Sequence, residues 1–588
     1  PLRATPVAKR KEEFGYAPFC TAVGSPSDWK GAWPDYGRIR YHIEHWTSSP
    51  DARQYATDDV DYTRRLYCYF SSMASGRYAK DARRFQNLAH CDFSVFQREA
   101  IKPLPSGDDD SELACMVGAV RWKGFSINSE GLKDLKSTAQ AVIDKQPSNF
   151  QSPVVCQKYL EEVLDETEKT VIRIDDKITT KGLILEEIST WMVDTVCELC
   201  SGQGCTHCDG GLVHSDKPHP AALRAKAILA TRRAKKEIEL YDKLLRAGRF
   251  HASFHVIGTL SSRMSGTDGL NPQGIKRDKT VRNCFSFVDD NLMLCGGDFD
   301  GFEISLMDAA YGDPVLHAEL ESGKKIHALA GVFFFDMTYE EILATRGLPD
   351  PEDKYDRSKK GVFALFYGGE AYTLKNRVGI PESKGDEAYR NWCRKYTVWG
   401  EARRAIFDQF CSMRQPNGIG TRVEWHEPSD YIESLFGFRR YFTLENKLCR
   451  ALFNLGENPP EEWKDLRIKV VRRDREQTGV GAVRSACFAA AFQIQAANMR
   501  AAANHVIQSS GGTITKGLQR RLWDLQPTGV NGWKIQPFNV HDEIQAPMIK
   551  ELIPESKKVI NDYLAEIRET VPLVALDWKE GMKTWADK

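Results

Sequence analysis

Carboxylates gather inside an apolar stretch near the end of the sequence. The segment FNVHDEIQAP (538–547) reads like a strand, yet it sets His541, Asp542 and Glu543 side by side at its centre. Neighbouring carboxylates repel each other, and apolar surroundings disfavour both unless a cation balances them. A divalent cation is one such partner. For this segment taken alone, a turn or a strand edge is the simpler explanation.

A second carboxylate cluster lies earlier in the chain. The apolar run LMLC (292–295) predicts a strand, and Asp298, Asp300 and Glu303 follow it. Carboxylate oxygens are ligands that Mg²⁺ prefers. If the two clusters meet on neighbouring strands, they satisfy the requirement of two-metal phosphoryl transfer, in which carboxylates bridge a pair of ions. A Mg²⁺-dependent nuclease would need the same clusters.

The segment DKYDRSKKGVFALFYGG (353–369), between the clusters, has a helical pattern. Tyr355, Lys359, Phe363 and Tyr367 recur every fourth residue and share one face of the predicted helix. A lysine among aromatic rings could bind a triphosphate and stack on a base. The alternative is an amphipathic core helix with one surface lysine.

Four cysteines lie within CELCSGQGCTHCDGG (197–211), namely Cys197, Cys200, Cys205 and Cys208. Two CxxC pairs at this spacing can chelate one tetrahedral zinc ion, and the glycines let the backbone turn around it. Disulfides are the alternative, but 15 cysteines, an odd number, in a chain without an export signal favour a reducing compartment. We therefore predict one structural Zn²⁺. The pattern resembles the zinc knuckles of DnaJ-type chaperones over this segment alone.

The composition is that of a globular protein, with 41% hydrophobic and 28% charged residues. The 81 basic side chains equal the 81 acidic ones, so net charge gives no indication of a nucleic-acid partner, and only local basic clusters do. No apolar run is long enough to predict a membrane span, and the first residues lack the apolar core of a secretion signal.

The remaining patterns indicate the elements that would position these groups. Charged helical segments run from about 130 to 250, interrupted by the cysteine segment, and strand-rich, glycine-rich sequence follows over 251–320. Helical patterns dominate 325–450, and an alanine-rich helix is expected over 480–520. Strands return over 534–549, before a final helix.

The segments Asp298–Glu303, Lys359–Tyr367 and His541–Glu543 resemble motifs A, B and C of the family A DNA polymerases, the bacterial polymerase I class, in the same order. Four further segments agree with that family: GTLSSRMSGTDGLNPQGI (258–275), KKIHALA (324–330), SLFGFRRY (434–441) and RSACFAAAFQIQAAN (484–498). The resemblance covers about 255–588. Its departures indicate a divergent, phage-like or mobile-element member.

The resemblance implies a template-directed DNA polymerase that adds dNTPs to a primer 3′ end with two Mg²⁺ ions. It implies that Asp298 and Asp542 hold the ions, that Glu543 sits beside them, and that Lys359 binds the triphosphate. Other nucleotide contacts are expected from Glu303, His327, Arg357, Phe363 and Tyr367. Contacts to primer-template DNA are expected from Arg263, Asn271, Gln273, Arg484, Gln493 and His541, with Gln495 as the alternative to Gln493.

One departure affects sugar selection. Glu303 occupies the position that crowds the sugar 2′ carbon in the family and so excludes ribonucleotides. Phe299 stands where the family has a tyrosine, so the usual phenol hydrogen bond to this glutamate is absent. The strength of sugar discrimination is therefore open.

The resemblance implies an α+β right-hand polymerase fold, in which a palm with an antiparallel sheet carries helical fingers and a helical thumb. The expected parts are the thumb (106–255) with a zinc-knuckle insertion (197–211), the first palm segment (256–320), the fingers (321–450) and the second palm segment (451–588).

Residues 1–105 resemble the C-terminal part of an RNase H-like 3′–5′ exonuclease domain. Tyr55 and Asp59 have the YxxxD spacing of its third motif, whereas residues 1–50 offer no candidate for the earlier motifs. We expect proofreading to be incomplete in this chain, with completion by a separate exonuclease-bearing chain favoured over truncation or a vestige. A phage-encoded enzyme would act in the cytoplasm of its bacterial host.

Two other functions fit part of this pattern. A single-subunit RNA polymerase shares the three motifs, but Glu303 and Phe363 favour a DNA polymerase. A non-catalytic DNA-binding replication scaffold would be expected to lose Asp298, Lys359 and Asp542 first.

Overall fold

The computed structural model describes residue 54, residues 57–63, residue 65 and residues 109–588 with short gaps. The gaps are 148, 151, 175–176, 198–199, 204–211, 268–270, 277, 287–291, 350–351, 367–368, 370, 419, 467–468, 473–474 and 527–533. Tyr55 and most of the predicted exonuclease-like segment lie outside the described residues, while Asp59 is exposed on the short helical stretch 57–63.

A four-stranded antiparallel sheet carries both carboxylate clusters. Its strand order is β17–β18–β10–β19, with bounds Phe538–Val540, Glu543–Gln545, Leu294–Asp300 and Ala575–Met582. Asp298 on β10 lies opposite Glu543 on one side and Asp577 on the other. The strands expected at 292–295 and 534–549 are confirmed, and β10 runs on through both aspartates of the motif. The sequence reading did not foresee β19, whose mainly exposed positions interrupt the apolar pattern.

Two glycines let the strands of this sheet approach β10 closely. A Cβ at Gly297 would lie 2.8 Å from the main-chain oxygen of Asp577, and one at Gly296 would lie 2.3 Å from Oε1 of Gln545. Real Cβ atoms do not approach so closely. Gly297, which faces a main-chain oxygen, is therefore required by the packing of β10 against β19, whereas Gly296 leaves room for the Gln545 side chain.

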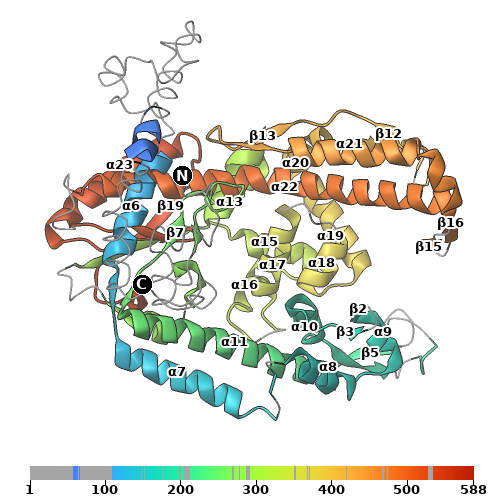
Figure 1. The fold of residues 1–588 in the computed structure, drawn as a ribbon, viewed down its shortest axis with the longest axis horizontal. Helices are drawn as coiled ribbons and strands as arrows, with labels where there is room; N and C mark the ends of the chain where they lie inside the picture. Colours follow the sequence, from blue (N-terminus) through green and yellow to red (C-terminus); the bar gives the residue numbers. More distant parts are fainter. Residues whose placement is uncertain are drawn as a thin grey trace, which may run out of the picture.

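Helices cover the sheet and connect it to the rest of the molecule. The 45-residue helix α22 (Gly479–Trp523) confirms the expected alanine-rich helix and crosses the molecule from the sheet to the tip of a long arm, where it runs beside α21 (Thr443–Glu457) (Figure 1). With α13 (Phe302–Tyr311) and α23 (Ile553–Arg568), its second half contributes to the largest apolar core. The predicted boundary at 450/451 falls inside α21.

The described N-terminal part forms an arm of paired helices. The helices α6 (Asp109–Lys123), α7 (Ser129–Asp144) and α11 (Pro220–Ala247) lie in sequence, and α7 runs alongside α11 (Figure 1), with Lys136 Nζ 2.7 Å from Asp242 Oδ1. Between α7 and α11 lies an insertion with an apolar core of its own. Its elements are α8 (Pro153–Glu161), α9 (Glu166–Val171), β2 (Arg173–Ile174), β3 (Lys177–Ile178), α10 (Gly182–Ile188), β4 (Met192–Val196) and β5 (Leu212–Pro218).

Short elements link the arm to the sheet. Strands β6 (Arg249–Phe250), β1 (Phe125–Ile127) and β9 (Phe285–Ser286) form a small sheet, and β7 (Phe254–His255) pairs with β8 (Ser265–Gly266). The turns η3 (Pro272–Gly274), η6 (Lys550–Leu552) and η7 (Trp585–Asp587) and the helix α12 (Lys279–Arg282) complete this region.

A helical group packs beside α13 and α22, as expected for 325–450. Its helices are α14 (Pro314–Glu321), α15 (Ile326–Phe335), α16 (Tyr339–Ala344), α17 (Lys354–Phe366), α18 (Ala371–Val378), α19 (Glu382–Lys395) and α20 (Thr397–Phe410). Three hairpins and one turn follow, namely β11 (Met413–Arg414) with β12 (Glu424–Trp425), β13 (Tyr431–Glu433) with β14 (Arg439–Tyr441), η5 (Glu461–Asp465), and β15 (Lys469–Arg472) with β16 (Arg475–Thr478).

Candidate active site

The sheet brings the two predicted carboxylate clusters together. Val540 pairs with Glu543, so His541 and Asp542 form a two-residue turn between β17 and β18. β18 is the direct neighbour of β10, which places this turn beside Asp298. His541 has a φ of 62°, in the left-handed region where glycine is favoured at the first position of such a turn. The tight turn answers the question raised by the sequence, because it projects Asp542 from the end of the hairpin.

Glu543 has a different environment from the two aspartates. Its side chain is 2% exposed and accepts hydrogen bonds from both terminal nitrogens of Arg282, at 3.3 and 3.1 Å. Trp585 Nε1 donates to it at 2.7 Å and Gln545 Nε2 at 2.5 Å. Burial alone would raise the pKa of this carboxyl, but Lys588, Trp585 and Arg282 together hold the pKa below its ordinary value. Glu543 is therefore an ionised structural anchor whose removal would leave Arg282 buried without this partner.

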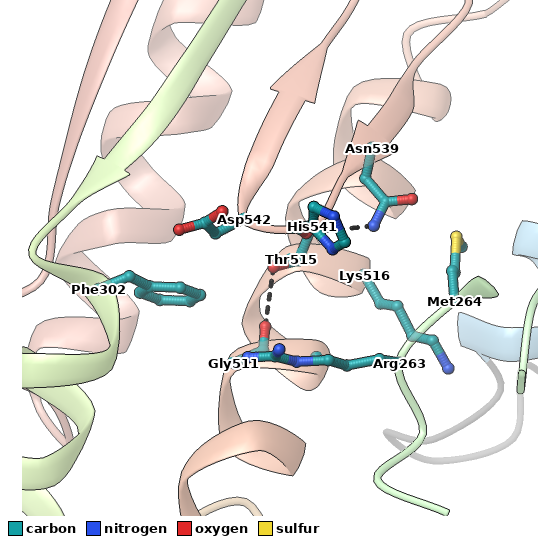
Figure 2. A pocket seen from close by; sticks show the side chains of 10 residues that line it. Arg263, Met264, Phe302, Gly511, Thr515, Lys516, Asn539, His541 and Asp542 are labelled. Atoms are coloured by element: carbon teal, nitrogen blue, oxygen red, sulfur yellow. Dashed lines mark hydrogen bonds between the residues drawn. The ribbon is translucent and has the colours of Figure 1, made fainter. Parts of the chain in front are cut away.

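A pocket opens beside the hairpin turn. Figure 2 shows Asp542 and Phe302 on one side and Arg263 and Lys516 toward the other, with α22 as the floor. Its full lining is Arg263, Met264, Phe302, Gly511, Gly512, Thr515, Lys516, Asn539, His541 and Asp542. Basic residues and a carboxylate thus line the same space, where Lys516 Nζ pairs with Asp110 Oδ1 at 2.7 Å and Arg263 with Glu303.

Arg263 is fixed at the edge of this pocket. Its Nε donates to the main-chain oxygen of Gln508 at 3.1 Å, and its Nη2 lies 3.5 Å from Glu303 Oε1. Gly511 and Gly512 allow this approach, since a Cβ at Gly512 would lie 3.2 Å from the Arg263 side chain. The guanidinium therefore connects α22 to the predicted sugar-selecting glutamate.

Asn271 and Gln273 support the loop that carries Arg263. Asn271 Oδ1 accepts from the Gln273 main-chain nitrogen at 2.9 Å, and Gln273 Nε2 donates to the Met264 main-chain oxygen at 3.0 Å. Neither residue lines the pocket. Their hydrogen bonds give them a supporting role in this structure, beside the predicted contact with DNA.

The helix α17 presents the predicted nucleotide-binding face. Lys359 is exposed on it, and the ring of His327 on α15 lies 5.9 Å from that of Phe363 and 5.5 Å from that of Tyr355. Burial, with Lys359 nearby, lowers the pKa of His327 to about 4. This histidine is therefore neutral at pH 7. Tyr367 lies outside the described residues.

Arg357 is directed away from that face. Its Nε donates to the main-chain oxygen of Val378 at 2.8 Å and its Nη2 to that of Gly379 at 3.0 Å. These carbonyls belong to the end of α18 and the residue that follows it. The structure therefore shows Arg357 joining α17 to α18 and does not bring it together with Lys359 at a shared ligand.

The structure does not bring Arg484 and Gln493 together with the pocket. Arg484 Nε donates to Gly456 O at 2.7 Å, where the start of α22 runs beside the end of α21, and Gln493 is exposed. Gln495 is buried against Ser412 and Met413 instead. The pocket is lined by a later part of the same helix, which was not identified from the sequence because alanines recur along the whole helix. The adjacent glycines Gly511 and Gly512 mark this part in the sequence.

Two carboxylates, Asp298 and Asp542, are the groups that fit Mg²⁺. Magnesium is often held by one or two carboxylates together with substrate phosphates, so a pair suffices. Within the described ranges no group of three or more His, Cys, Asp or Glu side chains could hold a metal by itself. A cation already lies at this place, because Lys588 Nζ is 3.8 Å from Asp298 Oδ2. The carboxyl thus occupies an environment that accepts positive charge.

Two of the predicted zinc ligands, Cys197 and Cys200, come directly after strand β4. Val196 pairs with Leu212, so residues 197–211 form the connection between the two strands. Cys197 is buried and Cys200 half-buried, while Cys205 and Cys208 lie outside the described residues. The zinc site stays a prediction.

Comparison with known proteins gives a family and a fold. The family model described as DNA polymerase family A matches residues 216–587, more than half of the chain. Among solved structures, the chain is similar to the polymerase domain of Pol1 from M. smegmatis, in complex with DNA primer-template and dNTP. That match has a TM-score of 0.53 and 19% identity, and it covers 84% of this chain and 72% of the other.

A search for membrane-spanning helices gave none among the described residues.

Proposed function

This chain belongs to DNA polymerase family A and is a DNA-directed DNA polymerase, and we propose which of its residues carry out the copying of the template. The expected α+β fold of this family is confirmed for the described part. We propose that Asp298 and Asp542 form the centre of the site. The observation that carries this proposal is their convergence on neighbouring parts of one sheet, beside a pocket with basic residues.

The proposed reaction is attack of the primer 3′-oxygen on the α-phosphorus of a dNTP. A bond to the primer oxygen forms, the bond to the bridging oxygen of the β-phosphate breaks, and pyrophosphate leaves. Asp298 and Asp542 would hold two Mg²⁺ ions, which when bound supply activation of the hydroxyl and stabilisation of the leaving group. Glu543 maintains the strand geometry around Asp298 through its buried contacts.

The incoming dNTP would lie against α17. Lys359 offers an exposed ammonium for the triphosphate, and neutral His327 offers a ring N–H to a phosphate oxygen. Phe363 lies next to His327 and would stack on the sugar and base. Tyr367 is proposed for the base-pair pocket on the resemblance alone. The bonds of Arg357 to α18 support a structural contribution more than a phosphate contact.

Arg263 and Glu303 together would select deoxyribose. Phe299 has no hydroxyl to hold Glu303, and it stacks instead on Phe302 with ring centroids 4.2 Å apart. The Arg263 guanidinium lies 3.5 Å from the Glu303 carboxylate and can take over the orienting role. We therefore propose that this enzyme excludes rNTPs, with Arg263 as the group that positions Glu303.

Primer-template DNA is the proposed macromolecular partner. Arg263 and His541 line the pocket beside Asp542, where the primer terminus must lie for its hydroxyl to react. Side chains that contact phosphate and sugar would fix the register of the duplex without reading its sequence. The arm of α7 and α11 is proposed as the thumb.

Proofreading and location are proposed on the resemblance. Tyr55 and Asp59 would be the remnant of an exonuclease site that a separate chain completes. A phage-like enzyme of this kind would work in the cytoplasm of a bacterial host.

Primer extension by the purified chain tests the proposed function. With Mg²⁺, a primed template and dNTPs, we expect extension, and with rNTPs in parallel we expect little. Glu303→Ala should admit rNTPs, and Arg263→Lys should weaken discrimination because one ammonium cannot hold the carboxylate as a planar guanidinium does. Equal use of both nucleotide types by the wild type would refute the proposed selection. A chain that binds DNA without extending the primer would support the scaffold alternative.

A further inference from the structure

The neighbouring strands β18, β10 and β19 place acidic residues in one row. Asp298 lies directly opposite both Glu543 and Asp577. Directly paired positions share a face of a sheet, and like charges in such pairs destabilise it. This row therefore needs cations in the protein without bound metal.

Lys588 supplies one of those cations. Its Nζ lies 3.1 Å from Glu543 Oε2 and 3.8 Å from Asp298 Oδ2, and its side chain is 13% exposed. Arg282 already contacts Glu543 with both terminal nitrogens. The ammonium of Lys588 is therefore shared between Glu543, its nearer partner, and Asp298.

The position of Lys588 is built into the fold. Trp585 is fully buried, and its ring packs edge-on against Phe285 and Phe538, with centroids 5.6 and 5.7 Å apart. The main-chain nitrogens of Lys583 and Thr584 both donate to Asp587 Oδ2, at 2.8 and 2.9 Å. These contacts fix the residues immediately before Lys588, so that its side chain enters the row from a rigid turn.

We propose that Lys588 is an internal cation that balances Asp298 until a divalent ion binds, and that it sets the metal affinity of the site. This inference rests on the proposed metal-binding role of Asp298. When an ion binds Asp298, the ammonium loses that partner and keeps Glu543. A fixed positive charge beside the ion lowers the affinity, which makes Lys588 a positioning residue for the site rather than a catalytic one.

Removal of the ammonium should therefore strengthen metal binding. Lys588→Met keeps the aliphatic stem and removes the charge, and we expect about tenfold tighter binding of the first divalent ion. Lys583→Met is the matched control, because Lys583 is an exposed lysine of the same segment. Its removal should leave the affinity unchanged.

The measurement is Mn²⁺ binding to the full chain without DNA or nucleotide, followed by electron paramagnetic resonance of free Mn²⁺. Tighter binding by Lys588→Met than by both the wild type and Lys583→Met is the expected result. Equal or weaker binding by Lys588→Met would overturn the inference. If that variant does not fold, Lys588→Gln provides the same comparison with a polar side chain.

A further variant separates this inference from the proposed function. Asp298→Asn should lose Mn²⁺ binding if the carboxylate is a ligand. If Asp298→Asn binds Mn²⁺ as the wild type does, the proposed metal site itself is refuted. If it loses binding while Lys588→Met matches the wild type, only the role of Lys588 is refuted.

Discussion

At the scale of single residues, His541 adopts a backbone conformation that is unfavourable for any residue other than glycine. Its φ of 62° occupies the left-handed region, which costs a residue other than glycine roughly 1–2 kcal/mol. It also lines the pocket beside Asp542. A strained histidine where glycine would be favoured indicates that the imidazole is retained for function.

His541→Gly should separate the two contributions. We expect the free energy of unfolding to change by less than about 1 kcal/mol, because relief of strain offsets the added chain entropy. The KM for primer-template should rise, since the imidazole is lost. Urea unfolding and steady-state extension are the measurements. His541→Ala is the control that keeps the strain, and primer-template binding by His541→Gly at the wild-type level would argue against a role for the ring.

His327 makes a prediction about pH. Its pKa is lowered to about 4, mainly by burial, from an ordinary 6.5. Between these values the unfolded chain binds a proton that the folded chain does not, so stability falls as the pH drops from 6.5 toward 4. The expected loss is about 1.4 kcal/mol for each pKa unit.

His327→Gln should remove that part of the pH dependence. Urea unfolding of the wild type and of this variant at pH 7, 6, 5 and 4 is the measurement, and His426→Gln, which changes an exposed histidine, is the control. A wild-type and a His327→Gln curve with equal slopes over this range would show that His327 is not buried in its neutral form.

The sequence predicted individual residues where a short motif determined both identity and place. Asp542 and Arg263 were expected and line one pocket, and Asp298 was expected and lies on the strand next to the turn that carries Asp542. The contribution of α22 was misplaced, because an alanine-rich helix offers many equivalent registers to a motif match. Arg282, Trp585 and Lys588 were missed because they lie on α12 and after β19, outside the motifs, and approach Glu543 only in the folded chain.

At the scale of elements, the spacing of β10 and β19 depends on the absence of one side chain. A Cβ at Gly297 would meet the main-chain oxygen of Asp577 at 2.8 Å. Gly297→Ala should therefore push the strands apart and reduce the free energy of unfolding by about 1–3 kcal/mol. Because Asp298 is the next residue, extension should also slow.

Gly118→Ala is the matched control for that experiment. It lies inside α6, where an added Cβ meets no atom within 4 Å. Alanine should stabilise the helix there by about 0.8–1 kcal/mol. Chemical denaturation of both variants is the measurement, and a Gly297→Ala protein as stable as the wild type would contradict the packing account.

Elements with a strong period were predicted best. The long helix α22 followed from its composition, and strands were expected over 534–549, where the structure adds the turn between β17 and β18. β19 was not foreseen because it lies at the edge of the sheet with mostly exposed side chains, so its place depends on pairing with β10 rather than on a pattern of its own.

At the scale of the whole molecule, the insertion between α7 and α11 is a distinct unit. It has its own apolar core, which includes part of α11. The chain as a whole has a fold similar to that of the polymerase domain from M. smegmatis. The predicted zinc segment closes the β4–β5 hairpin of this insertion, a place where a metal ion can replace a larger core.

Metal analysis tests the zinc prediction. The purified chain should hold one Zn²⁺, and Cys200→Ser should lose it, since three thiolates bind the ion less tightly than four. Cys487→Ser, which changes a half-buried free cysteine on α22, is the control. A zinc content that is unchanged in Cys200→Ser would exclude Cys200 as a ligand. Extension activity should remain, because the insertion lies apart from the carboxylates.

The domain boundaries stay predictions at this scale. The positions of the motifs assign residues to palm and fingers, but α22 runs without a break from the region beside α21 to the sheet. A domain boundary placed from motifs misses a helix that contacts two parts of the molecule. The amino-acid composition of such a helix does not change at the point where its neighbours change.

Single-turnover incorporation of one dNTP by Asp542→Asn tests whether this carboxylate holds a catalytic metal ion. The account predicts a loss of rate of roughly a thousandfold or more, because the metal-binding carboxylate is replaced by a neutral amide of the same shape. Primer-template binding should be retained. Asp562→Asn, an exposed carboxylate on α23, is the control. A folded Asp542→Asn protein that incorporates dNTP as fast as this control would contradict the account.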